Sequence, residues 1–336
     1  EYKKWHDLDV TDELLNSEEF WKFGKGCATR QSSGDVLNRL TSFIPNLMGG
    51  SADLAPSNKS DMKNTGFFSK EDRSGQNIHF GVREHAMAAI TNAIAAHGGL
   101  KAYCATFFVF SDYMKGAMRL SALMNLPVTY ILTHDSIGVG EDGPTHQPIE
   151  QLAALRSLPN MTVFRPADSN ETAAAWFYAV TNKTTPTSLV LTRQNLPLYD
   201  IDGKVALKGA YILKDSKNET PDVILMASGS EVELIMGAAD ELAKKGIDAR
   251  VVSMPSFELF EAQSDEYKES VLPKAVRNRV AVEAASTFGW HKYVGLDGEV
   301  IGLDHFGASA PAGTLFKEFG FTVENVVETA LKVVGK

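Results

Sequence analysis

The sequence predicts an α/β protein with two domains, each a mostly parallel sheet flanked by helices. Short apolar runs alternate with helical patterns along most of the chain, which is typical of parallel sheets covered on both faces. With 336 residues, the chain also exceeds the usual size of one domain. The alternation breaks at residues 196–209, where Pro, Asp and Gly occur without a clear period. We therefore expect a linker segment at 1–23, domains at 24–195 and 210–336, and an interdomain linker at 196–209.

In the first domain, each strand is predicted from a short run of apolar and β-branched residues. These runs cover 45–50, 101–107, 127–133, 161–165 and 187–192. Helices are predicted between them, where apolar residues recur with a helical period, at 33–43, 83–97, 111–125, 147–157 and 169–182. A further helical pattern lies around residues 13–21, within the segment expected to be a linker.

The second domain repeats the alternation with different residues. Strands are predicted at 222–227, 248–253, 279–283 and 299–303. Helices are predicted at 230–245, 265–272 and 323–334. The last of them ends in Lys-Val-Val-Gly-Lys, which places cations where the helix dipole favours them.

Composition excludes several classes of function. The net charge of −9, with no block of Lys and Arg, argues against a general affinity for nucleic acid or acidic membranes. No apolar run approaches the ~18 residues that a membrane-spanning helix needs. Cys27 and Cys104 are the only cysteines and have no CxxC neighbour, which argues against a disulfide framework or a zinc site. We expect a protein of the reducing cytoplasm.

A polar loop at 133–148, Thr-His-Asp-Ser-Ile-Gly-Val-Gly-Glu-Asp-Gly-Pro-Thr-His-Gln-Pro, is the first candidate for a functional site. It follows a strongly apolar predicted strand and precedes a predicted helix. Ligands of open α/β sheets bind just outside the carboxyl ends of the strands. Two histidines, three carboxylates and three glycines gather in this loop, although a solvated surface loop would have a similar composition.

Two further stretches carry residues suited to a cofactor ring. Glu84 lies in the first turn of an Ala-rich apolar helix, where it is either a carboxylate favoured by the helix N-terminus or a buried proton carrier. Phe107, Phe110 and Tyr113 recur at a spacing of three residues and so share one helical face or the rim of one pocket. Core packing is the alternative for these rings, because aromatic stripes usually serve it.

Taken together, these stretches resemble transketolase. The motifs FGVREHAM, TFFVFSDY, THDSIG, GEDGPTHQP, FRPAD and LTRQN occur in the family's order and at family-like spacing. GGSADLAPSN at 49–58 and MPSFELFEAQ in the second domain extend the similarity over nearly the whole chain from about residue 24. The resemblance implies an aminopyrimidine-binding domain of a thiamine diphosphate enzyme, followed by a transketolase C-terminal domain.

The resemblance also implies how thiamine diphosphate is held. Glu84 is the carboxylate expected at N1′ of the aminopyrimidine, where it exchanges a proton with the ring. Phe107, Phe110 and Tyr113 match the aromatic pocket for that ring. Asp53, in GGSAD, matches a residue beside the cofactor near the subunit interface.

For the substrate, the resemblance implies a phosphate-binding set made of Arg30, Ser57, His134 and Arg193. Guanidinium groups and a hydroxyl are donors that suit a phosphate dianion. The implied reaction is the reversible transfer of a two-carbon ketol unit from a ketose phosphate to an aldose phosphate, as in the pentose phosphate pathway.

Two residues of the 133–148 loop are expected at the reacting end of the sugar. Asp142 matches a residue that bonds a sugar hydroxyl, and His146 matches a donor near the reacting carbonyl. The resemblance thus assigns catalytic roles to Glu84, His134 and His146.

The family's diphosphate half carries a GDG motif and a later Asn that bind Mg²⁺ or Ca²⁺, and the sequence has no such motif. Glu141-Asp142-Gly143 belongs to the polar loop at 133–148, which we call the substrate loop, and Leu296-Asp297-Gly298 has no suitable Asn. We therefore expect no metal ligands here, a diphosphate-binding domain as partner, a homodimer, and no activity from this chain alone. The non-Met start favours a fragment of a longer enzyme over one subunit of a naturally split transketolase.

Other thiamine enzymes and a non-catalytic role remain as alternatives. The beta chain of 2-oxoacid dehydrogenases would not be expected to carry THDSIG together with DGPTHQP. Pro144, Pro148 and His134 favour transketolase over deoxyxylulose phosphate synthase. Dihydroxyacetone synthase shares much of the same loop and is harder to separate. A dimerisation or regulatory module is the alternative outside enzymology, and we expect the second domain to support a dimer.

Overall fold

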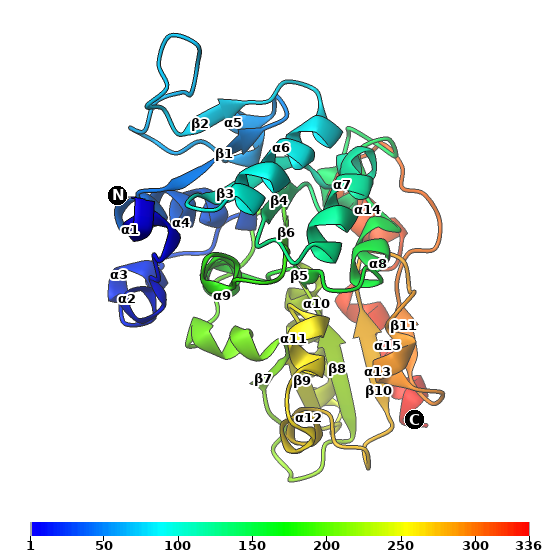
Figure 1. Cartoon of the computed structure of the whole chain (residues 1–336). Helices are drawn as coiled ribbons and strands as arrows, with labels where there is room; N and C mark the ends of the chain where they lie inside the picture. Colours follow the sequence, from blue (N-terminus) through cyan, green and yellow to red (C-terminus); the bar gives the residue numbers. More distant parts are fainter. Residues whose placement is uncertain (1, 336) are drawn as a thin grey trace.

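The first domain is built on a six-stranded, wholly parallel sheet, which confirms the predicted fold class. The computed structural model describes residues 2–335, so residues 1 and 336, at the outer ends of the predicted segments, lie outside it. Figure 1 shows this sheet above the second one. The strand order is β2-β1-β3-β4-β6-β5. The strands are β1 (Leu47–Ser51), β2 (Asn77–His79), β3 (Lys101–Phe107), β4 (Thr129–Thr133), β5 (Thr162–Phe164) and β6 (Thr187–Leu191).

Helices cover both faces of this sheet, which is why its strands are apolar throughout. Neighbouring residues of β3 pack on opposite faces: Tyr103 and Ala105 join one buried cluster and Cys104 joins the other. One face is covered by α4 (Thr29–Phe43) and α9 (Ser169–Thr181). The other is covered by α6 (Glu84–His97), α7 (Ser111–Leu123) and α8 (Gln151–Arg156). Two short helical elements, α5 (Ala55–Asn58) and the 3₁₀ turn η1 (Phe108–Phe110), follow β1 and β3.

Residues 2–21 pack against the sheet domain instead of forming an extended tether. They contain α1 (Tyr2–His6), α2 (Thr11–Leu15) and α3 (Glu18–Trp21). Leu14 and Phe20 are fully buried in the cluster under α4 and α9. The indole of Trp21 donates a hydrogen bond to the carbonyl of Leu14 at 3.0 Å, which ties α3 back to α2.

The second domain has a five-stranded sheet with one antiparallel edge. Its order is β11-β10-β8-β9-β7, and only β7 runs antiparallel, paired with β9. The strands are β7 (Tyr211–Lys214), β8 (Val223–Ala227), β9 (Ala249–Ser253), β10 (Arg279–Val282) and β11 (Glu299–Ile301).

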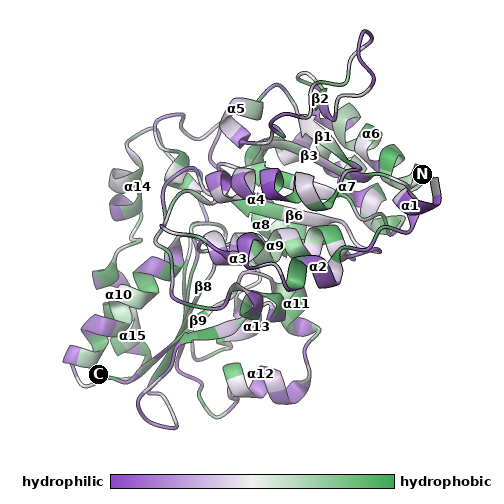
Figure 2. Ribbon diagram, turned by 90° about the vertical axis from the view of Figure 1, so that its left-hand side faces the viewer, coloured by the Kyte–Doolittle hydropathy of each residue, from purple (hydrophilic) through white to green (hydrophobic). Residues whose placement is uncertain are grey.

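Helices again flank this sheet. The helices that pack in its two buried clusters are α10 (Glu231–Lys244), α14 (Ala312–Glu318) and α15 (Val323–Val333) on one side, with α11 (Phe257–Glu261), α12 (Asp265–Val271) and α13 (His291–Val294) on the other. Helix α12, at the periphery of the domain, is mostly hydrophilic (Figure 2). Within residues 2–335, no helix has both the length and the apolar character that crossing a bilayer requires.

Residues 196–209 connect the two domains, and part of this segment packs against α9 of the first domain and β7 of the second. They include the turn η3 (Gly203–Lys208), in which Ala206 is fully buried with Ala174 of α9 and Tyr211 of β7. Polar contacts accompany this packing: the Glu171 carboxylate of α9 accepts hydrogen bonds from the hydroxyls of Tyr211 at 2.8 Å and Ser253 at 2.5 Å. The second domain is therefore held against the first by buried contacts.

Candidate active site

The predicted site residues lie at the carboxyl edge of the first sheet. Because its strands are parallel, residues that follow different strands meet at one edge. Asp53 follows β1, Phe107 ends β3, His134 follows β4 and Arg193 follows β6. The topology therefore brings together motifs that are far apart in the sequence.

Two of these residues adopt a backbone conformation that side chains other than glycine rarely take. Asp53 has φ of 61° and His134 has φ of 63°. Such left-handed residues are found preferentially at ligand sites, where the surrounding structure holds them in place. Asp53 is exposed, whereas His134 is only 3% exposed.

An aromatic row runs from the buried edge of the sheet to the surface. The ring of Phe107 stacks on that of Phe110 at 5.9 Å and 10°, and Phe110 stacks on Tyr113 at 6.0 Å and 28°. Phe107 is buried, and Tyr113 is 67% exposed. His146 meets Phe110 edge-on at 5.4 Å, which brings the 133–148 loop to the same row. The row offers a flat apolar surface of the kind that a heteroaromatic ring stacks on.

Glu84 begins α6 and is 8% exposed. A carboxylate at this position is favoured by the helix dipole, so the fold supports its charge at the edge of an apolar helix. Its side chain forms no hydrogen bond with any of residues 2–335. Together with the aromatic row, this fits a planar cofactor ring that carries a basic nitrogen.

A chain of hydrogen bonds that ends at Thr133 fixes the orientation of the His134 ring. The chain of bonds starts at the carbonyl of Ala105, which can only accept. The Ser51 hydroxyl donates to it at 3.0 Å and accepts from the amide of Asn58 at 2.6 Å. The Asn58 carbonyl oxygen then accepts from the Thr133 hydroxyl at 2.7 Å.

These bonds also determine which nitrogen of His134 carries the proton. Since the hydrogen of Thr133 is given to Asn58, Thr133 Oγ1 must accept from His134 Nδ1, 2.8 Å away. His134 Nε2 is then the acceptor, and it faces Arg30 Nη1 at 3.4 Å. We call the set Ser51, Asn58, Thr133 and His134 the histidine relay.

A cationic cluster lies at the end of the relay. Arg30 Nη1 also donates to the carbonyl of Ser57 at 2.9 Å. Burial, and then the charge of Arg193, lowers the pKa of Arg30. The pKa of His134 falls to about 3 because the ring is buried and lies near Arg30 and Arg193. His134 is therefore neutral at physiological pH, and the two guanidinium groups supply the charge for an anion.

One ring joins the cationic cluster to the aromatic row. The His134 ring lies 3.7 Å from that of Phe107, while its Nε2 faces Arg30. An anion at the arginines and a flat ring on the aromatic row would therefore be neighbours. Asp142 is exposed in the same loop as His146, and the structure gives it no contact with this cluster.

The relay and a neighbouring ion pair were not predicted from the sequence. Asn58 and Thr133 lie inside motifs recognised as family-like, and their spacing gives no sign that they bond each other. Arg165, in FRPAD, is fully buried and binds Asp135 at 2.8 Å. A charged residue after an apolar strand was the only signal that could have marked it.

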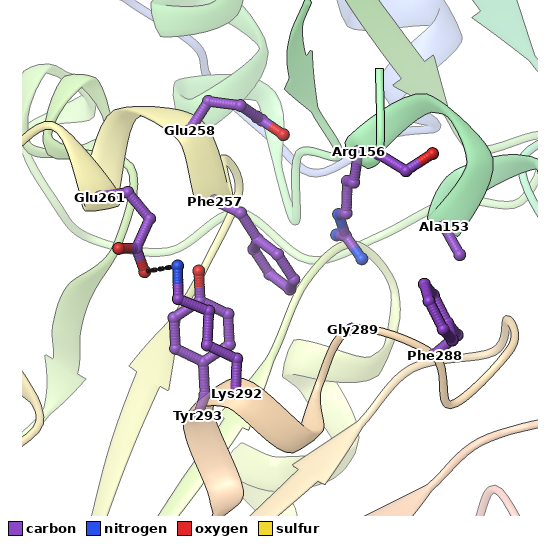
Figure 3. A pocket seen from close by; sticks show the side chains of 10 residues that line it. Ala153, Arg156, Phe257, Glu258, Glu261, Phe288, Gly289, Lys292 and Tyr293 are labelled. Carbon is purple, nitrogen blue, oxygen red and sulfur yellow. Dashed lines mark ion pairs between the residues drawn. The ribbon is translucent and has the colours of Figure 1, made fainter. Parts of the chain in front are cut away.

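A cavity of about 340 Å³ lies between the domains, away from the candidate site residues. Figure 3 shows Arg156 beside the ring of Phe257, with the guanidinium 3.8 Å from the ring centroid, and Phe288 across the opening. Lys292 pairs with Glu261 at 2.9 Å. None of the candidate site residues predicted from the sequence lines this cavity.

No metal centre is evident within the described part of the chain. Residues 2–335 contain no group of three or more His, Cys, Asp or Glu side chains placed to hold an ion.

Comparison with known proteins places both domains in one family. The family model for the transketolase pyrimidine-binding domain matches residues 25–198, and that for the transketolase-like C-terminal domain matches residues 209–322. A transketolase of Bacillus subtilis is 59% identical over 317 residues, covering 93% of this chain and 48% of the relative. The chain thus spans about half the length of the curated relatives it matches.

Solved structures agree with this match. Transketolase from Leishmania mexicana superposes with a TM-score of 0.90 at 45% identity, covering 97% of this chain and 49% of that one. A chain described as a split-gene transketolase, inactive beta4 tetramer, superposes with a TM-score of 0.75 at 25% identity. The superposition covers 92% of this chain and 99% of that one.

Proposed function

The chain belongs to the transketolase family, and on this premise we propose that it supplies the aminopyrimidine and sugar-phosphate halves of a ketol-transfer site. The whole reaction would be the reversible transfer of a two-carbon ketol unit from a ketose phosphate to an aldose phosphate, in the pentose phosphate pathway. The observation that carries the proposal is the position of His134, against Phe107 on one side and Arg30 on the other.

In this proposal Arg30, Arg193 and His134 bind the phosphate of the sugar, together with the hydroxyl of Ser57. The neutral His134 ring is protonated more easily once a dianion offsets the charge of the two arginines, because that charge helps to hold its pKa low. Phosphate binding should therefore raise the pKa of His134. Asp142 and His146, on the same loop, would bond the hydroxyl and carbonyl groups at the reacting end.

Thiamine diphosphate, when bound, would supply carbanion-stabilising chemistry that no side chain here provides. Phe107, Phe110 and Tyr113 would hold its aminopyrimidine ring. Glu84, which is 8% exposed, would hold a proton at N1′ of that ring. Asp53 would lie beside the cofactor at the subunit boundary.

The proposal includes a partner for the diphosphate and its metal, because the chain spans about half the length of the transketolases it matches. We propose that a transketolase diphosphate-binding domain is this partner, with Mg²⁺ or Ca²⁺, in a homodimeric assembly in the cytoplasm. Exposed apolar side chains on α6 and α7 support an interface there: Ile90 is 48% exposed, Leu120 48% and Leu123 66%. The inactive split-gene relative supports the expectation that such a half-chain has no activity alone.

We favour this function over the other thiamine enzymes and over a non-catalytic module. The relatives are transketolases, and the cationic cluster is suited to a phosphorylated sugar. Donor and acceptor kinetics would distinguish transketolase activity from dihydroxyacetone synthase activity.

Binding of ribose 5-phosphate to this chain tests the substrate half of the proposal without the partner. Calorimetric titration should detect binding of ribose 5-phosphate but not of ribose. Arg30→Met should abolish this difference in binding. Lys183→Met, which removes an exposed cation paired with Asp9, is the matched control. Equal binding of ribose and its phosphate would refute the assignment of the cationic cluster.

A further inference from the structure

A buried ion cluster joins the two domains directly behind the substrate loop. Arg165 Nε and Nη2 contact Asp135 Oδ2 at 3.0 and 2.8 Å, and Arg165 Nη1 pairs with Glu231 of the second domain. Glu283, also of the second domain, receives both terminal nitrogens of Arg156 at 2.7 and 2.9 Å and lies 3.8 Å from Arg165. We call these five residues the interdomain ion cluster, and all of them are at least nine-tenths buried as side chains.

The backbone of the second domain is shaped around Arg165. Gly229 has φ of +59°, and a Cβ at this position would lie 2.7 Å from Arg165 Cζ. The main chain is joined as well: Arg165 N donates to the carbonyl of Pro255 at 2.8 Å, and Gly229 N donates to the carbonyl of Arg165 at 3.0 Å. Arg165 Nη1 also donates to the carbonyl of Ser228 at 2.9 Å. Arg165 is thus fixed by the second domain on several sides.

The cluster ends at the residue next to His134. Asp135 follows His134, whose left-handed backbone needs support from its surroundings. The relay holds His134 through Thr133, and the Asp135 carboxylate is held through Arg165. Since Arg165 is held by Glu231, the position of His134 is set partly by the second domain.

The second domain also contacts the other end of the substrate loop. Gln147 Nε2 donates to the carbonyls of Gly140 at 2.8 Å and Ala308 at 2.9 Å. The Ser309 hydroxyl donates to the carbonyl of Glu141 at 2.5 Å. The segment around Ala308 thus holds the loop that carries Asp142 and His146.

We infer that the second domain positions the substrate loop, with Arg165 and Glu231 as positioning residues for His134. This rests on the proposed function, because the loop matters only if it binds the sugar phosphate. It assigns to the second domain a role in the site beyond support of a dimer. The residues do not touch substrate, so their effect should be visible first in the state of the His134 ring.

The experiment compares two buried arginines in the full chain. Arg165→Lys shortens the side chain so that one ammonium cannot reach both Asp135 and Glu231. Arg250→Lys is the matched control, because Arg250 is also buried, bonds Asp215 at 2.7 Å and the Ser270 carbonyl at 2.8 Å, and does not contact the loop at 133–148. Histidine-labelled protein is followed by NMR, with the His134 signal assigned by loss in His134→Gln.

Arg165→Lys should move the His134 signal and weaken binding of inorganic phosphate about fivefold or more. Arg250→Lys should leave the signal in place and change the phosphate affinity by no more than about twofold. If Arg165→Lys fails to fold, Glu231→Gln, which keeps the shape and removes the charge, is used in its place. An unmoved His134 signal in the folded variant overturns the inference.

Failure of the proposed function gives a different result. In that case the wild-type chain itself does not bind phosphate, while the NMR comparison of the two lysine variants still decides whether Arg165 positions His134. Ser309→Ala tests the second contact independently, because it should move the signal of His146 and leave that of His134. Identical His146 signals in this variant and the wild type count against that part of the inference.

Discussion

Replacement of Thr133 by valine tests the histidine relay at its central bond. Thr133→Val keeps the shape of the side chain and removes a hydroxyl that both donates to Asn58 and accepts from His134. Thr133 and Asn58 are fully buried and His134 nearly so, so water cannot take the place of the lost partner.

The expected cost follows from two buried groups left unpaired. Asn58 Oδ1 loses its donor and His134 Nδ1 loses its acceptor, at about 1–3 kcal/mol each, so stability should fall by about 2–6 kcal/mol. The assay is urea denaturation of the purified chain. The slope of the unfolding free energy against urea concentration should stay unchanged, which shows that the native and unfolded states keep their compactness.

Thr106→Val is the matched control on the neighbouring strand. Thr106 is equally buried, but its hydroxyl has no hydrogen-bond partner among residues 2–335. Its removal should be neutral or stabilising by up to about 1 kcal/mol. NMR of the His134 ring adds a second readout. In Thr133→Val the ring should no longer be held in the Nδ1–H tautomer, whereas in Thr106→Val it should be. Equal losses of stability in the two variants, or an unchanged tautomer in Thr133→Val, would refute the relay.

Two further predictions concern stability alone. Burial, together with the charge of Asp168, raises the pKa of Glu171 to about 7, so the folded state binds more protons than the unfolded one below that pH. Stability should therefore fall by on the order of 2 kcal/mol as the pH rises from about 4.5 to about 7, and Glu171→Gln should flatten this slope in denaturation curves. Gly229→Ala should cost about 3 kcal/mol or more, since it combines left-handed strain with displacement of Arg165 from a buried ion pair. Gly246→Ala, at φ of +76° with open space around the Cβ, should cost only about 1 kcal/mol, and equal losses would contradict the account.

The strands of both sheets that are buried on two faces were the elements best predicted from sequence. Continuous apolar runs such as 101–107 and 222–227 correspond to β3 and β8. β2 was missed because it is a three-residue edge strand, Asn77–His79, without an apolar run. β7 was missed because Tyr211–Lys214 directly follows the irregular stretch at 196–209. Edge strands pair on one side only, so their sequences are less constrained.

Helix prediction failed where the elements are short. The helix expected at 147–157 begins only at Gln151, since the residues up to Pro148 complete the substrate loop and contact the second domain. Helices α11, α13 and α14 have four to seven residues and were not predicted, because such short segments give only a weak helical period. The segment at 1–23 resembles a linker in composition, but Leu14 and Phe20 fill the space beside α4 and α9.

The sequence motifs name candidate site residues, but they do not show how these residues are bonded to one another. Parallel topology brings Phe107, His134 and Arg193 to one edge, and the motifs named each of them. The partners of buried polar groups depend on which strands become neighbours. The bond between Asn58 and Thr133 and the pair of Arg165 with Glu231 therefore emerged only from the structure.

The most direct test of the proposed function is ketol transfer from xylulose 5-phosphate to ribose 5-phosphate with thiamine diphosphate and Mg²⁺. It is measured for this chain alone, and for the chain mixed with a separately prepared diphosphate-binding domain of the Bacillus subtilis relative. We predict activity only in the mixture, and its loss on Glu84→Gln with the fold retained. Activity of the chain alone, or full activity of the mixture with Glu84→Gln, would contradict the account.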